Sequence, residues 1–179
     1  MALLDATVVL VSSLSAFFDL KIRKIPNWVI AVGAFSGVVL NAYQGLNGLI
    51  QSVSGLVVGI LVLLLPFALG WIGAGDVKFF GVVGALLGVS WLPRVFFYSA
   101  LVAGAIAVVY LVMGLSHTVR FKDLWVDVKL TLLSFGRVLP SPVQKRTETS
   151  GGSVPWGVAF AIGTIIAYYF DSTGQFAGF

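Results

Sequence analysis

The chain has 179 residues, of which 59% are hydrophobic and only 10% are charged, with a formal net charge of +4. A soluble domain carries about 25% charged residues, so these charges are too few to cover a water-soluble surface. A mean hydropathy of +1.03 indicates lipid as the main solvent. The lack of cysteine and the single histidine exclude disulfides, thiol nucleophiles and Cys- or His-based metal sites. We therefore expect no metal and no cofactor. We also expect no nucleic-acid partner, since no basic face combines with stacking aromatic residues.

Six apolar runs, separated by polar residues, predict six transmembrane helices. In chain order they cover residues 3–18, 28–40, 49–72, 77–89, 95–115 and 154–170. The first run lacks a basic n-region and an A-x-A-like cleavage site, so we interpret it as a retained helix. Gly55 with Gly59, and Gly81 with Ala85, form small-xxx-small pairs that are typical of close helix contacts. The predicted fold class is an all-α polytopic membrane bundle of about six transmembrane helices, formed as one integral-membrane domain over residues 1–179.

The basic residues predict the orientation of this bundle. With six helices, one set of loops holds ten of the eleven Lys and Arg residues, and the other set holds Arg94 alone. Because loops rich in Lys and Arg stay in the cytoplasm, both termini are expected outside. Residues 116–153 then form a cytoplasmic segment. Apolar residues recur at helical spacing over residues 120–139, which predicts an amphipathic helix at the lipid surface, and "PSPVQKRTETSGGS" is typical of a flexible linker.

Five of the seven carboxylates have an ordinary explanation. Asp5 and Asp171 fall near the outer ends of the first and last helices, where water solvates them. Asp123 and Asp127 belong to the polar face of the amphipathic segment, and Glu148 belongs to the linker. Two carboxylates, in the first helix and before the fourth, need a different account.

Asp19 closes the first helix in "FFDLKIRKIPN", and Asp76 lies between the third and fourth helices in "GAGDVKFF". The predicted topology brings both to the cytoplasmic face. One interpretation is helix capping with charge pairing, of Asp19 with Lys21 or Arg23 and of Asp76 with Lys78. The other is a pair that shares one proton, because two adjacent carboxylates cannot both ionise. Such a pair supports aspartyl proteolysis, which needs neither a metal nor a nucleophilic side chain.

The residues around these carboxylates also allow two interpretations. Gly73 and Gly75 let the backbone bend or approach a substrate closely, or they mark a helix break with a glycine cap. Pro26 and Asn27 predict a helix start with Asn27 as the N-cap. Together with Gly73, Gly75 and Lys78 they are also the expected residues of the active-site loop that binds substrate. Lys78 is either a charge that sets topology or a group that tunes the neighbouring carboxylate.

"FFDLKIRKIPN", "GAGDVKFF" and the "VPWG" that opens the last helix occur in an order that resembles the type IV prepilin peptidases, membrane aspartyl proteases of the GxGD type. The resemblance implies that Asp19 and Asp76 are the catalytic pair and that Gly73 and Gly75 are the family glycines. It also implies the reaction and its place. Such enzymes remove the basic leader from prepilins or pilin-like proteins, after a Gly, at the cytoplasmic face of the bacterial inner membrane.

The chain departs from the large members of that family in one respect. Bifunctional members carry a cysteine-bearing cytoplasmic segment near the N-terminus and methylate the new N-terminus, whereas this chain has no cysteine. It is similar to the short, peptidase-only members that serve Flp (tight-adherence) pili, so no N-methyltransferase activity is expected. Two alternatives stay open: a non-catalytic membrane protein of pilus or secretion assembly, and a proton-coupled transporter with Asp19 and Asp76 as a relay.

Overall fold

The computed structural model describes residues 2–113 and 155–170, and every regular element in these residues is a helix. The elements are α1 (Ala2–Ile22), α2 (Asn27–Ala42), α3 (Leu46–Ala68), α4 (Ala74–Leu87), the 3-10 helix η1 (Val89–Trp91), α5 (Leu92–Val112) and α7 (Trp156–Phe170). The predicted amphipathic helix and linker at 116–153 lie outside the described residues.

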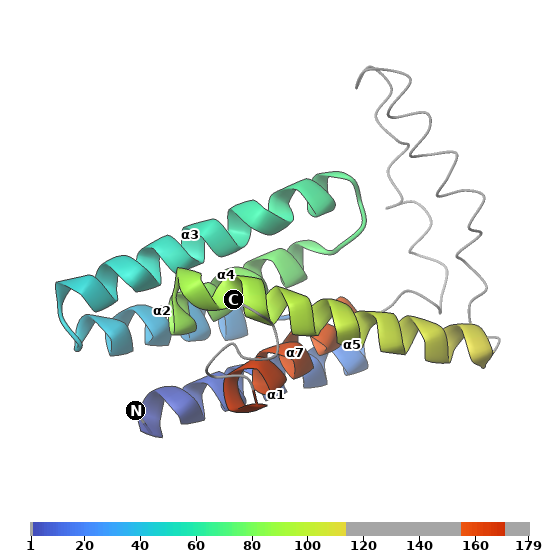
Figure 1. The fold of residues 1–179 in the computed structure, drawn as a ribbon, viewed down its shortest axis with the longest axis horizontal. Helices are drawn as coiled ribbons and strands as arrows, with labels where there is room; N and C mark the ends of the chain where they lie inside the picture. The colour runs from blue at the N-terminus through green and yellow to red at the C-terminus, as the bar shows by residue number, and fades with distance from the viewer. Residues whose placement is uncertain (1, 114–154, 171–179) are drawn as a thin grey trace, which may run out of the picture.

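The long helices run along the bundle in alternating directions (Figure 1). As a result, the C-terminal end of α1 and the N-terminal ends of α2, α4 and α7 meet at one end, which we call the aspartate end because it contains Asp19 and Asp76. The N-terminal end of α1, the C-terminal ends of α2, α4 and α7, and η1 form the opposite, distal end. Residues from distant parts of the sequence therefore meet at each end.

Three segments of the described chain are long and apolar enough to cross a membrane: Leu3–Ile22, Leu46–Ala68 and Val89–Tyr110. Asn27–Ala42 and Trp156–Phe170 are shorter apolar helices. The all-helical class and the membrane character of the chain are thus confirmed in outline. The count of six spanning helices and the outside position of both termini stay predictions.

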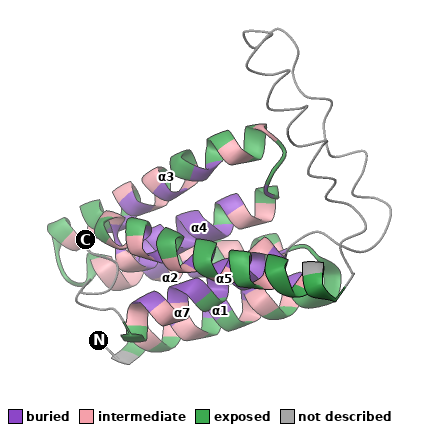
Figure 2. Cartoon of the chain, turned by 45° about the vertical axis from the view of Figure 1, so that its right-hand side comes forward, coloured by how far each residue is buried: buried purple, intermediate pink, exposed green. Residues whose placement is uncertain are grey.

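The helix α4 forms the centre of the bundle and is buried almost throughout (Figure 2). Its backbone touches that of α3 because both helices carry glycine at the contact. A Cβ atom on Gly55 would collide with the carbonyl oxygen of Gly84, and one on Gly84 would collide with that of Gly55. One turn along, a Cβ on Gly59 would lie 2.8 Å from the carbonyl oxygen of Phe80. Small residues thus bring these two helices into van der Waals contact, the main attraction between helices in lipid.

Two groups of helices make up the bundle. In the α2–α3–α4 group, the Ser52 hydroxyl of α3 donates to the carbonyl of Ala85 at 2.6 Å, and the Asn41 amide of α2 donates to the same carbonyl at 3.0 Å. In the α1–α5–α7 group, α7 packs between α1 and α5. The groups meet where the rings of Phe80 and Phe160 lie 5.2 Å apart. Each group therefore has its own internal contacts, and a smaller interface joins them.

The helix bounds differ from the apolar runs at two turns. The third run extends to residue 72, but α3 ends at Ala68 because Gly70 adopts a left-handed conformation (φ +74°). The first run ends at residue 18, but α1 continues to Ile22 and stops where Arg23 turns left-handed (φ +53°). Hydropathy marks where a chain is apolar, whereas backbone conformation decides where a helix ends.

Candidate active site

The last turn of α1 carries Asp19 into the interior of the bundle. Ser12, Ser15 and Asp19 recur at helical spacing and are all buried, and the Asp19 residue is only 7% exposed. A buried carboxylate is costly unless hydrogen bonds replace its lost water. The site therefore has to supply donors to Asp19.

The first turn of α7 supplies these donors. The N–H of Val158 donates to Oδ2 of Asp19 at 3.1 Å, and the N–H of Gly157 adds a second favourable interaction. The first amides of a helix have no partner within the helix, and their aligned dipoles favour a negative charge. Asp19 thus caps α7 from a neighbouring helix, and the positive charge of Arg23 acts on it from the end of α1.

Gly157 is required for this contact. A Cβ atom at this position would lie 2.8 Å from Cγ and 2.9 Å from Oδ2 of Asp19. Gly157 and Val158 are candidate site residues that sequence reasoning missed. The only signal was the "VPWG" stretch, which belonged to the resemblance but pointed to no carboxylate. Asp19 and Val158 lie 139 residues apart in the chain, so no local sequence pattern could predict their contact.

Asp76 lies in the first turn of α4 and closes that turn. Gly73 is the N-cap residue, and its N–H donates to Oδ2 of Asp76 at 3.2 Å. A Cβ on Gly73 would lie 3.2 Å from that oxygen, whereas a Cβ on Gly75 would meet Ile25 only at 3.5 Å or more. Neither glycine has the left-handed conformation that requires glycine. The two glycines therefore differ. A Cβ at Gly73 would crowd the carboxylate, whereas a Cβ at Gly75 would make only ordinary van der Waals contact.

Among the described residues, the remaining predicted site residues form no hydrogen bond with either carboxylate. The sequence predicted Asn27 as the N-cap of α2. The N-cap is instead Pro26, which is part-buried. Asn27 is exposed, and its Oδ1 accepts a hydrogen bond from Nζ of Lys78 at 3.1 Å. The Asn27 side chain faces Lys78 and therefore does not fold back to cap its own helix. Asn27 and Lys78 thus tie α2 to α4 at the aspartate end.

The two carboxylates interact electrostatically. Asp76 precedes the predicted span at 77–89 and lies outside the three long apolar segments. Burial first, and then the negative charge of Asp19, raise the pKa of Asp76 from 3.8 to about 7, against the opposing effect of the Gly73 N–H. At neutral pH this carboxyl is therefore close to half protonated. Within the described residues, no group of three or more His, Asp or Glu side chains is placed to hold a metal ion.

Asp76→Asn is expected to raise the unfolding temperature of the purified protein by several degrees at about pH 8 and to change it little at about pH 4. Folded Asp76 keeps its proton up to about pH 7, whereas the unfolded chain releases it near 3.8. Stability of the wild type therefore falls as pH rises between these values, and asparagine lacks this titration. Thermal unfolding in detergent across this range checks the difference, and parallel curves for both proteins would contradict it.

The helices and the paired carboxylates define a helical membrane protein with an acidic site at one end of its bundle. A family model described as the type IV leader peptidase family matches residues 6–108, which is more than half of the chain and includes Asp19 and Asp76. The chain belongs to the type IV leader peptidase family and is a leader peptidase-like membrane protease. No curated protein and no solved structure gives a match. The matched residues end before α7, so the contact of Asp19 with Gly157 and Val158 comes from the structure alone.

Proposed function

We propose that this protein is an aspartic endopeptidase that removes the basic leader from type IV or Flp prepilins, or from pilin-like proteins. The cut falls after a Gly, at the cytoplasmic face of the bacterial inner membrane, and the product keeps an unmethylated N-terminus. One observation carries the proposal: in a chain of the leader peptidase family, the charge of Asp19 acts on a part-buried Asp76 at the same end of the bundle. Paired carboxylates with coupled ionisation are the arrangement that aspartyl proteolysis uses.

The surroundings of the two carboxylates suggest a division of roles. In this proposal Asp19, which accepts a hydrogen bond from the Val158 N–H of α7, serves as the base. Asp76, to which only the Gly73 N–H donates among the described residues, serves as the acid. In the first step, Asp19 takes a proton from water as the water oxygen bonds to the scissile carbonyl carbon, and Asp76 gives its proton to the carbonyl oxygen. In the second step, the carbonyl re-forms, the C–N bond breaks, and the amine leaves with the proton that Asp19 had taken. The remaining hydroxyl proton returns to Asp76.

Gly73 and Gly75, with Pro26, Asn27 and Lys78, form the rim of this site in the proposal. An extended substrate segment would approach along Gly75, which carries no Cβ and borders Ile25. The apolar helix of the substrate would stay in the bilayer beside the bundle. This placement restricts water at the scissile bond and strengthens the electrostatic effect of the two carboxylates.

Purified protein in detergent, incubated with a prepilin, tests the function. The expected result is a single cut after the leader Gly, detected as a product whose mass is that of the prepilin without its leader. A prepilin with that Gly replaced serves as the control and should stay intact. Folded protein that leaves several cognate prepilins uncut would contradict the proposal.

A further inference from the structure

At the aspartate end, polar and apolar surfaces lie at the same level of the bundle, where level means position along the bundle axis. The contacts between helices fix these levels. A Cβ atom on Gly48, in α3, would collide with the carbonyl oxygen of Asn41, in α2, so these residues lie side by side near the distal end. Both helices extend from there to the aspartate end, in opposite sequence directions (Figure 1). Counting equal numbers of residues along each helix places Asn27, the first residue of α2, level with Val62 of α3.

Contacts through α4 give the same alignment. A Cβ on Gly37 of α2 would lie 2.9 Å from the carbonyl oxygen of Ala85 in α4, and one on Gly59 of α3 would lie 2.8 Å from that of Phe80. Because α4 is parallel to α2 and antiparallel to α3, these contacts also align the start of α2 with α3 near Val62. The start of α2 is therefore level with an interior turn of α3 rather than with the end of α3.

Beside α2, the surface at this level is polar. Asn27 and Lys78 are exposed, and Nζ of Lys78 donates to Oδ1 of Asn27 at 3.1 Å. A lysine can often extend to reach the headgroups, but this bond holds the ammonium beside the first residue of α2. Contact with acyl chains is costly for an ammonium and an amide. Trp28, also exposed, is a residue type enriched at membrane–water interfaces. Headgroups and water are therefore required at this level.

Beside α3, the surface at the same level is apolar. Leu61 and Val62 are exposed, and α3 continues beyond them to Ala68. At 1.5 Å per residue, the part after Val62 adds about 9 Å. The large exposed side chains of this part are also apolar: Leu64, Leu65 and Phe67. Acyl chains suit this surface and headgroups do not, so the hydrocarbon boundary belongs about 9 Å further out beside α3 than beside α2.

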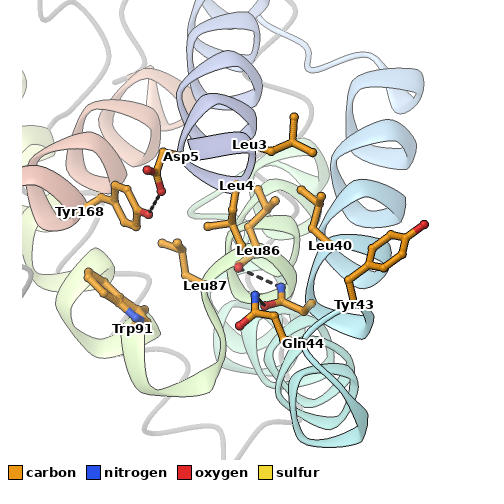
Figure 3. Close-up of a pocket in the computed structure, with 11 residues that line it drawn as sticks. Leu3, Leu4, Asp5, Leu40, Tyr43, Gln44, Leu86, Leu87, Trp91 and Tyr168 are labelled. Carbon is orange, nitrogen blue, oxygen red and sulfur yellow. Dashed lines mark hydrogen bonds between the residues drawn. The ribbon is translucent and has the colours of Figure 1, made fainter. Parts of the chain in front are cut away.

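The lengths of the two helices agree with this difference. α2 has 16 residues and α3 has 23, so they extend over about 24 and 34 Å, compared with about 30 Å for a typical hydrocarbon core. Figure 3 shows the other end of α2, where Tyr43 extends outward from the bundle and Gln44 follows. The exposed apolar side chains of α2, Val32 and Phe35, thus lie between polar and aromatic residues at both ends.

We propose that the protein thins the bilayer on one side: the hydrocarbon layer is thinner beside α2 than beside α3, with phospholipid headgroups at the level of Asn27 and Lys78. Local thinning is one way in which a bilayer accommodates a short apolar helix. Headgroups and water then reach the first turn of α4, which contains Asp76, from the α2 side, while acyl chains cover the α3 side. The inference does not depend on the proposed peptidase reaction.

The test measures the depth of single spin labels on the full chain in vesicles of phosphatidylethanolamine and phosphatidylglycerol. The chain has no cysteine, so each single-cysteine variant carries one label. Trp28→Cys and Leu61→Cys form a matched pair, since these residues lie at about the same level and are 53% and 58% exposed. Collision rates with oxygen and with a water-soluble nickel chelate report depth. The Trp28 label is expected at the headgroup boundary, and the Leu61 label about 10 Å deeper, the rise from Leu61 to the end of α3.

Tyr43→Cys and Leu46→Cys, at the distal ends of the same two helices, serve as the control and should report equal depths near the headgroups. Equal depths for the Trp28 and Leu61 labels would overturn the proposal. So would an unequal Tyr43 and Leu46 pair, because a tilted bundle would then explain the offset. A Leu61 label shielded from both reagents would assign this face of α3 to protein contact and also overturn it. If Trp28→Cys does not fold, Asn27→Cys with Val62→Cys replaces the first pair.

Discussion

Asp19→Asn and Asp76→Asn are each expected to lower the rate of leader removal about a thousandfold or more. Asparagine keeps the size of the side chain and can still accept hydrogen bonds from Val158 and Gly73, but it can neither take a proton from water nor give one to the scissile carbonyl. Losing a general acid or base typically slows a reaction by about 10²–10⁴, and members of a catalytic unit are each indispensable. The measurement is the initial rate of prepilin cleavage by purified protein.

The control for these variants has to separate lost chemistry from lost structure. Ser54→Ala removes a hydroxyl that bonds only within α3 at the helix surface and should cleave at the wild-type rate. All four proteins should show a cooperative thermal transition in detergent. Cleavage by either single aspartate variant within tenfold of the wild-type rate would sink the paired-carboxylate mechanism. It would also favour a non-catalytic role for the aspartates.

Gly157→Ala is expected to lower kcat about a hundredfold while leaving KM nearly unchanged. The new methyl group would lie 2.8 Å from Cγ of Asp19, so the carboxylate has to move away from the α7 amides. A shift of about 1 Å in a reacting group can cost about 10²-fold in rate. KM should be spared, because the substrate is proposed to approach from Gly75 rather than from α7.

Two other glycines serve as matched controls for Gly157→Ala. A Cβ on Gly104, in α5, meets nothing within 4 Å, so Gly104→Ala should leave both stability and rate unchanged. A Cβ on Gly163, also in α7, would lie 2.5 Å from the backbone N of Ser99, so Gly163→Ala should reduce stability. Its rate per folded molecule should stay near that of the wild type. Equal loss of rate per folded molecule in Gly157→Ala and Gly163→Ala would assign Gly157 a packing role only.

The sequence predicted those parts of the site that follow from chain order and hydropathy. Alternating apolar helices bring the end of the first helix and the start of the fourth to the same end of a bundle, and the structure places Asp19 and Asp76 there. The hydrogen-bond partners of the residues at the site could not be predicted from the sequence. Asp76 bonds to Gly73 rather than to Lys78, and Lys78 bonds to Asn27. Each polar side chain has several possible hydrogen-bond partners nearby, and only the packed structure determines which bond forms.

The contact between Asp19 and α7 was unpredictable for a different reason. Hydropathy gives the order of helices along the chain but not which helices are neighbours in the bundle. That choice depends on where small residues let backbones approach, as at Gly55 and Gly84 or at Gly163 and Ser99. Many glycines in apolar runs could serve this purpose, and a single sequence does not tell them apart.

The two groups of helices have a consequence for the carboxylates. Asp19 belongs to the α1–α5–α7 group, and Asp76 belongs to the α2–α3–α4 group, so the boundary between the groups passes through the site. The spacing of the two acids is therefore not fixed by any loop or single helix. It depends on how the α1–α5–α7 group packs against the α2–α3–α4 group, at contacts such as that of Phe80 with Phe160. A transmembrane substrate that contacts both groups of helices would therefore change the distance between Asp19 and Asp76.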